Sequence, residues 1–173
     1  MQALINTAQT HGYEPEILSH VEKVNKRQKM VLVNNIVDRF GEDLTELTFA
    51  IWGLAFKPGT DDVREATSLV VAEELIKREG AKINAYDAQA TEEFKRAIPD
   101  ECLSNIPFVS NRYDAVDSCD ALILITEWKE FRTPNRQFLE EKMNKSIIFD
   151  GRNIYDKKIQ DYGFELYQLG IEQ

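Results

Sequence analysis

The first forty residues carry a helical pattern of apolar positions. Gln2 to Thr10 is typical of a short helix ended by His11-Gly12, and Pro15 suits the first turn of a second helix. Apolar residues then recur at intervals of three and four until Gly41. The pattern predicts one helix from Pro15 to Phe40, roughly 25 residues or about 38 Å long. Because this rod is longer than one face of a small domain, we expect its first half to pack on another domain or subunit.

From Leu47 onward, apolar strand patterns alternate with helical ones. The predicted strands are Leu47–Trp52, Ala81–Tyr86, Phe108–Val109, Ala121–Thr126, Ser146–Phe149 and Phe164–Gln168. The predicted helices are Ser68–Glu79, Thr91–Ala97, Arg112–Cys119, Asn135–Met143 and Lys157–Tyr162. This alternation predicts an α/β fold: a Rossmann-like, doubly wound, mainly parallel sheet in three layers, preceded by a long helical arm. We expect the arm over residues 1–44 and the α/β domain over residues 45–173.

Composition narrows the classes of partner. The 173 residues suffice for one domain with a substantial core plus the arm, and no apolar run is long enough to cross a bilayer. We therefore expect a cytoplasmic protein. The net charge of −9 disfavours general attraction to nucleic acid or to a membrane surface. A phosphate ligand would have to be held by individual, locally placed cations.

Several familiar kinds of site lack their residues. Cys102, Cys119, His11 and His20 form no CxxC pair and no zinc-ligand spacing, so no metal site is expected. Cys119 precedes a buried strand and Cys102 has no basic neighbour to lower its pKa, so we expect both to be inert packing groups. The first strand turn carries only Gly53 and Gly59, not G-x-G-x-x-G, so the domain is not expected to bind NAD by itself.

The run from Gly53 to Glu65, GLAFKPGTDDVRE, is the strongest candidate for a ligand loop. It places two cations and three carboxylates after an apolar strand, and strand ends are where open α/β sheets bind ligands. The alternative is a plain loop in which Asp61 and Asp62 serve turns, while Lys57 and Arg64 are solvated or paired with those carboxylates.

This run resembles the signature G-[LA]-[AS]-F-K-x-x-T-D-D-x-R-[ED] of nucleotide-sugar 6-dehydrogenases, the UDP-glucose and GDP-mannose dehydrogenase family. The resemblance implies that Phe56 and Lys57 contact the nucleotide-sugar. It also implies that Arg64 reaches toward the nicotinamide cofactor, held by another domain. A lysine can compensate a diphosphate, and a guanidinium can hold a phosphate or a carbonyl through paired donors.

Two further stretches are similar to family motifs. Asp150-Gly151-Arg152-Asn153 resembles D-G-R-[NR], which makes Arg152 the second predicted substrate contact; the alternative is an Asp150–Arg152 pair in a turn. Thr126 to Phe131 resembles T-E-W-x-x-[FY], where we expect Trp128 and Phe131 to pack rather than to stack on a base. Asp87 ends a strand like the ribose-binding acid of Rossmann folds, but without the glycines a structural carboxylate is favoured.

The resemblance covers nearly the whole chain and implies the C-terminal part of such an enzyme, from its UDP-glucose branch. It implies a complete enzyme that oxidises UDP-glucose to UDP-glucuronate with two NAD and a cysteine nucleophile. The family's nucleophile lies in a segment just before a helix like Gln2–Thr10. We therefore expect this chain to lack both that cysteine and the N-terminal NAD domain, and to be inactive alone. A homodimer through the long helix is also implied.

Four alternatives remain open at this point. The chain could belong to the GDP-mannose branch or to the UDP-N-acetylmannosamine branch. It could also be a free-standing nucleotide-binding module, or one whose purpose is dimerisation.

Overall fold

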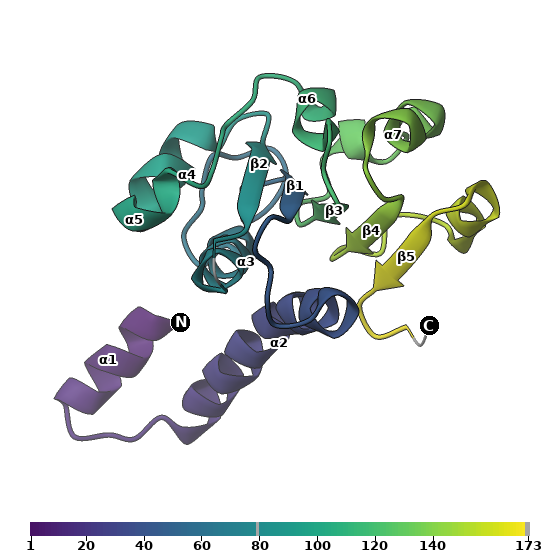
Figure 1. The fold of residues 1–173 in the computed structure, drawn as a ribbon. Coiled ribbons are helices and arrows are strands. Elements are labelled where there is room, and N and C mark those ends of the chain that lie inside the picture. The colour runs from purple at the N-terminus through teal and green to yellow at the C-terminus, as the bar shows by residue number, and fades with distance from the viewer. Residues whose placement is uncertain (79, 172–173) are drawn as a thin grey trace.

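Two helices precede the α/β body. The computed structural model describes residues 1–78 and 80–171. In it, α1 (Gln2–Thr10) runs beside the first half of α2 (Glu16–Phe40), and both stand away from the sheet (Figure 1). The second half of α2 instead joins the core, because its buried residues Leu32, Val33 and Ile36 all lie there. The second half of α2 thus packs against the α/β body, and the division of the chain into two parts at residue 44 stays a prediction.

Five strands form one parallel sheet. They are β1 (Thr48–Trp52), β2 (Lys82–Tyr86), β3 (Ala121–Leu124), β4 (Ile147–Asp150) and β5 (Glu165–Gln168). Their order across the sheet is β2-β1-β3-β4-β5, and every pairing is parallel. Strand β2 thus lies on one side of β1, and β3, β4 and β5 follow on the other side. The gap between β1 and β3 is the topological switch point of a doubly wound fold.

Alternate residues of the strands face two separate cores, which makes the three layers. One core holds the side chains of Phe49, Ile51, Ile83, Ile123 and Phe149, and it is covered by α2, α3 (Thr67–Lys77), α4 (Thr91–Ala97) and α5 (Asp100–Leu103). The other holds Ala50, Trp52, Leu122, Leu124 and Ile148, and it is covered by α6 (Arg112–Val116), α7 (Arg136–Lys142) and the 3₁₀ turn η2 (Lys157–Tyr162). The predicted fold class is confirmed.

The structure corrects several predicted boundaries. Helix α6 ends at Val116 rather than Cys119, because Asp117 is extended and Ser118 has a φ of 60°. Strand β3 ends at Leu124, two residues early, and the predicted strand at Phe108 is a single bridge to Ala85. Helix α3 begins one residue early and ends at Lys77; the predicted end at Glu79 lies outside the described residues.

Two short elements were not predicted. Helix α5 and the 3₁₀ turn η1 (Lys129–Phe131) contain too few residues to show a periodic pattern. Within the described residues, no helix combines the length and apolar content that crossing a bilayer requires.

Candidate functional site

A buried carboxylate fixes the loop that follows β1. Asp87 is only 6% exposed, and it accepts five hydrogen bonds at 2.7–3.1 Å, from the backbone N–H groups of Leu54, Ala55, Gln89 and Ala90 and from Nε1 of Trp128. Its two oxygens are saturated by these donors. This confirms the structural interpretation of Asp87, and Trp128 and the fully buried Phe131 are packing groups as predicted.

The rest of the loop is closed by its own polar groups. The N–H of Phe56 donates to the carbonyl of Asp62 at 2.8 Å. Arg64 donates from Nε and Nη2 to the two oxygens of Asp62, at 2.9 and 2.7 Å. These bonds, with one from the Arg64 backbone N–H and with the charge of Lys57, lower the pKa of Asp62 to about 2. Arg64 is nevertheless 87% exposed, so this guanidinium projects into solvent.

The strand end at β4 carries the second motif. Asp150 is fully buried and accepts hydrogen bonds from the N–H groups of Arg152 and Tyr155, at 3.1 and 2.9 Å, and from Gln168. The guanidinium of Arg152 pairs with Glu127 rather than with Asp150. The turn of the alternative interpretation is therefore present, but its ion pair between Asp150 and Arg152 is replaced by the one between Arg152 and Glu127.

Gly151 permits the close approach of the long helix. A Cβ at this position would lie 2.9 Å from the carbonyl oxygen of Leu124 and 3.2 Å from Cδ2 of Leu32. Only a residue without a side chain leaves room there for α2 to lie across the ends of the strands. Leu32 and Arg152 both line the cavity described next.

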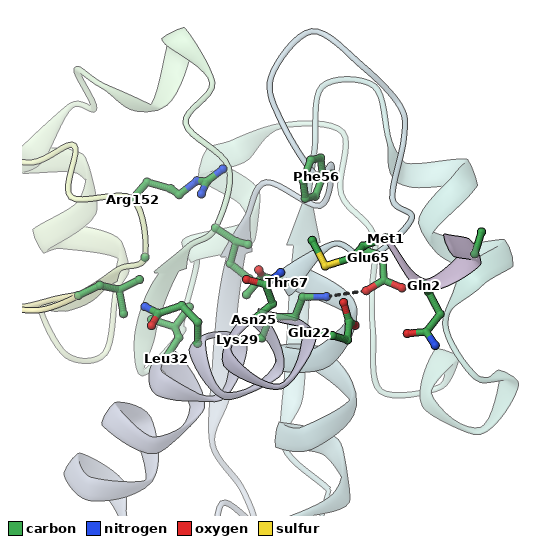
Figure 2. A pocket seen from close by; sticks show the side chains of 15 residues that line it. Met1, Gln2, Glu22, Asn25, Lys29, Leu32, Phe56, Glu65, Thr67 and Arg152 are labelled. Carbon is green, nitrogen blue, oxygen red and sulfur yellow. Dashed lines mark hydrogen bonds and ion pairs between the residues drawn. The ribbon is translucent and has the colours of Figure 1, made fainter. Parts of the chain in front are cut away.

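A cavity of about 520 Å³ opens between α2 and the carboxyl ends of the strands. Phe56 from the first motif and Arg152 from the second both line it, together with Ile125, Gly151 and Leu169 from the ends of β3, β4 and β5. Figure 2 shows Arg152 extending from the end of β4 toward the side on which Phe56 lies. The structure therefore brings two of the three predicted substrate contacts into one cavity, although they are almost one hundred residues apart.

The other two predicted contacts lie outside this lining. Lys57 is exposed and directly follows Phe56, but it does not line the cavity, and neither does Arg64. Their suggested contacts with a nucleotide-sugar and a cofactor stay predictions. Phe56 is 52% exposed, which leaves the surface of its phenyl ring free for a ligand.

Sequence reasoning missed the wall that α2 contributes. Asn25, Gln28 and Lys29 line the cavity, and Nζ of Lys29 pairs with the carboxylate of Glu65 at 3.0 Å (Figure 2). One signal was available, because residues 25–29 interrupt the apolar spacing of the helix with five polar residues in succession. A polar break on a helix that packs against a domain marks a face that is not core.

The cysteines are buried packing groups, as the sequence predicts. Both side chains are buried, and burial raises the pKa of each thiol, to about 12 for Cys119. Across the described part of the chain, no group of three or more histidine, cysteine, aspartate or glutamate residues is placed to hold a metal ion.

Comparison with known protein families places the chain in one family, over a range that includes both motifs. Residues 50–157 match the family model described as the UDP-glucose/GDP-mannose dehydrogenase family, UDP binding domain. The chain belongs to this family. It is 40% identical over 170 residues to the UDP-glucose 6-dehydrogenase of Pseudomonas aeruginosa and 35% identical to that of Bacillus subtilis. In both comparisons 97% of this chain matches 37% of the relative's length.

Solved structures agree with this assignment. A UDP-glucose dehydrogenase from Pyrobaculum islandicum superposes with a TM-score of 0.74 at 28% identity, over 96% of this chain and 34% of that protein. The GDP-mannose dehydrogenase of Pseudomonas aeruginosa gives a TM-score of 0.59 at 25% identity, over 86% of this chain and 33% of that one. This member of the UDP-glucose/GDP-mannose dehydrogenase family thus spans about a third of the relatives it matches.

The loops after β1 and β3 touch at the switch point of the sheet. A Cβ at Gly53 would lie 2.5 Å from Cβ of Thr126, so a side chain has no room at position 53. This contact holds the two loops together at the edge where open α/β sheets bind ligands.

Proposed function

We propose that the cavity between α2 and the strand ends holds the nucleotide part of a nucleotide-sugar, and that the chain is the substrate-binding part of a UDP-glucose 6-dehydrogenase. The observation that carries the proposal is that Phe56 and Arg152, from two separate motifs, line one cavity. Its volume of about 520 Å³ lies within the range of small-ligand sites. The names of the relatives and the UDP-binding family model support the choice of ligand.

The residues suit the parts of such a ligand. The guanidinium of Arg152 offers charge-assisted hydrogen bonds to a phosphate, and Lys57 adds positive charge on the neighbouring loop. The exposed ring of Phe56 provides an apolar surface for a base or a sugar ring. Binding energy from the nucleotide would fix the distance between the sugar and reacting groups that lie outside this chain.

In the complete protein we propose oxidation of UDP-glucose to UDP-glucuronate, with NAD as the oxidant in two steps. The NAD would be held mainly by another domain and approached by Arg64. The chain alone is expected to bind ligand weakly and to produce no NADH with any UDP-sugar. Accumulation of NADH in such an assay would contradict the proposal that another domain holds the NAD.

Calorimetry tests the binding site directly. We expect UDP to bind more tightly than GDP, which would contradict the GDP-mannose alternative. Arg152→Ala and Lys57→Ala should each weaken UDP binding, whereas Arg96→Ala, which removes an ion-paired arginine from α4, should not. Unchanged UDP affinity in both Arg152→Ala and Lys57→Ala would refute the site.

We also propose that the exposed part of α2 is covered by a second subunit. Ile17, Val21 and Val24 are 81%, 39% and 50% exposed, and they line an apolar hollow of about 420 Å³. Light scattering of Ile17→Asp and Val24→Asp tests this, with a lower mass expected than for the wild type. Deleting the first forty residues would be a poor test, because it would also remove the core residues Leu32, Val33 and Ile36.

A further inference from the structure

The segment Thr126–Trp128 contacts both motif loops. Thr126 is fully buried and donates its hydroxyl to the carbonyl of Ala55 at 2.6 Å. Trp128 donates to Asp87, the carboxylate that holds the backbone before Phe56. Glu127 lies between these two anchored residues, so its backbone has little freedom.

Glu127 uses this fixed position to hold Arg152. Its Oε2 accepts a hydrogen bond from Nε of Arg152, at 2.5 Å. This bond uses only the Nε atom of the guanidinium. Among the residues that the structure describes, Nη1 and Nη2 of Arg152 have no hydrogen-bond partner. These two nitrogens are the pair that can bind a phosphate in a fork.

We propose that Glu127 is a positioning residue: it fixes Arg152 by Nε and leaves the two terminal nitrogens available to a phosphate of the nucleotide. The inference rests on the proposed function, because it takes Arg152 as a contact of that ligand. The T-E-W stretch would then serve the site by joining the two motif loops: Thr126 and Trp128 bind the first loop, and Glu127 binds Arg152 of the second.

Two physical effects of Glu127 oppose each other. A free arginine side chain loses rotamer freedom when it binds, and a preformed hydrogen bond removes part of that loss from the binding step. The carboxylate also repels a phosphate, but Glu127 is 31% exposed, so water and salt screen this repulsion. The hydrogen bond acts at contact distance, where screening is weaker, so we expect positioning to outweigh repulsion.

The experiment is a double-mutant cycle on UDP binding, measured by calorimetry. Glu127→Ala should weaken UDP binding about tenfold, and Glu127→Gln, which keeps an acceptor oxygen, should recover most of the loss. In the Arg152→Ala background, Glu127→Ala should have no further effect. The matched control is Glu73→Ala, which removes a carboxylate of similar exposure, 35%, from an ion pair with Lys77 on α3.

A second readout needs no ligand. In the wild type the Nε–H proton of Arg152 should give a protected, shifted NMR signal, and Glu127→Ala should remove that protection while the unfolding midpoint changes little. Tighter or unchanged UDP binding in Glu127→Ala, or an equal loss in both Arg152 backgrounds, would overturn the inference. Unchanged UDP binding in Arg152→Ala would instead refute the Arg152 contact of the proposed function, even with the NMR signal as expected.

Discussion

Gly53 and Thr126 lie so close that a methyl group on Gly53 would sit 2.5 Å from Cβ of Thr126 and 2.6 Å from its backbone nitrogen. Gly53 also has a φ of 96°, a conformation that other residues rarely adopt. The contact joins the loops after β1 and β3 at the switch point of the sheet. The loop after β1 carries Phe56, and the loop after β3 carries Glu127, which holds Arg152. The distance between the two loops therefore sets the position of Phe56 relative to Arg152.

Gly53→Ala should therefore be strongly destabilising. Overpacking against backbone atoms and the positive φ together predict a loss of about 3 to 5 kcal/mol in the free energy of unfolding. Urea denaturation followed by circular dichroism measures it. Gly12→Ala, with a φ of 73° and no atom within 4 Å of the added Cβ, isolates the cost of the backbone conformation and should lose less. Equal losses in the two variants would show that the contact with Thr126 is unimportant.

Asp87→Asn should destabilise the protein and weaken UDP binding together. The substitution keeps the shape of the side chain, but it puts an amide NH₂ group where a carboxylate oxygen of the wild type accepts hydrogen bonds from backbone N–H groups. An unsatisfied buried donor predicts a loss of about 3 kcal/mol in the free energy of unfolding. Hydrogen exchange should show the amides of Leu54 and Ala55 exposed first. Wild-type protection of those two amides in Asp87→Asn would mean that Asp87 does not hold the loop.

The ion pair between Arg39 and Glu165 predicts a dependence of stability on pH. Nε and Nη2 of Arg39 donate to the two oxygens of Glu165, at 2.7 and 2.9 Å, and these bonds lower the pKa of Glu165 in the folded protein. A lowered folded-state pKa means that the pair stabilises the protein above the unfolded carboxyl pKa. The stabilisation is lost as the pH falls through the folded value.

Glu165→Gln should consequently lose stability at neutral pH but not in acid. Both side chains are partly exposed, 35% for Arg39 and 48% for Glu165, so the loss should be only about 0.5 to 1 kcal/mol. Unfolding midpoints of the two proteins, measured from neutral to acidic pH, should converge as Glu165 becomes protonated in the wild type. A constant difference across that range would contradict the electrostatic origin.

Thiol labelling should find both cysteines unreactive in the native protein. Cys102 is 3% exposed and Cys119 is fully buried, and burial raises the pKa of both thiols. Because a raised pKa keeps a thiol in its unreactive neutral form, neither should react with a disulfide reagent at mildly alkaline pH. Both should react after addition of denaturant. Rapid labelling of one thiol in the folded state would reopen it as a candidate nucleophile.

The motif loops were predictable because they depend on local rules. Carboxyl ends of parallel strands meet at one edge, so residues that follow β1 and β4 were expected to lie near each other, and Phe56 and Arg152 line one cavity. The cavity wall formed by Asn25 and Lys29 was not predicted, since the docking of a helix is decided by distant packing such as Leu32 against Gly151. Glu127 was missed for the same reason: its partner is 25 residues away.

One uninterrupted helix carries both the exposed apolar hollow and the polar wall of the cavity. Ile17 and Val24 lie near one end of α2, Lys29 at the cavity, and Leu32 in the core, without a break between them. A molecule that binds to the exposed end of α2 and changes the tilt of the helix would move Lys29 relative to Glu65. By thermodynamic reciprocity, filling the cavity would then change the affinity of that molecule by the same factor.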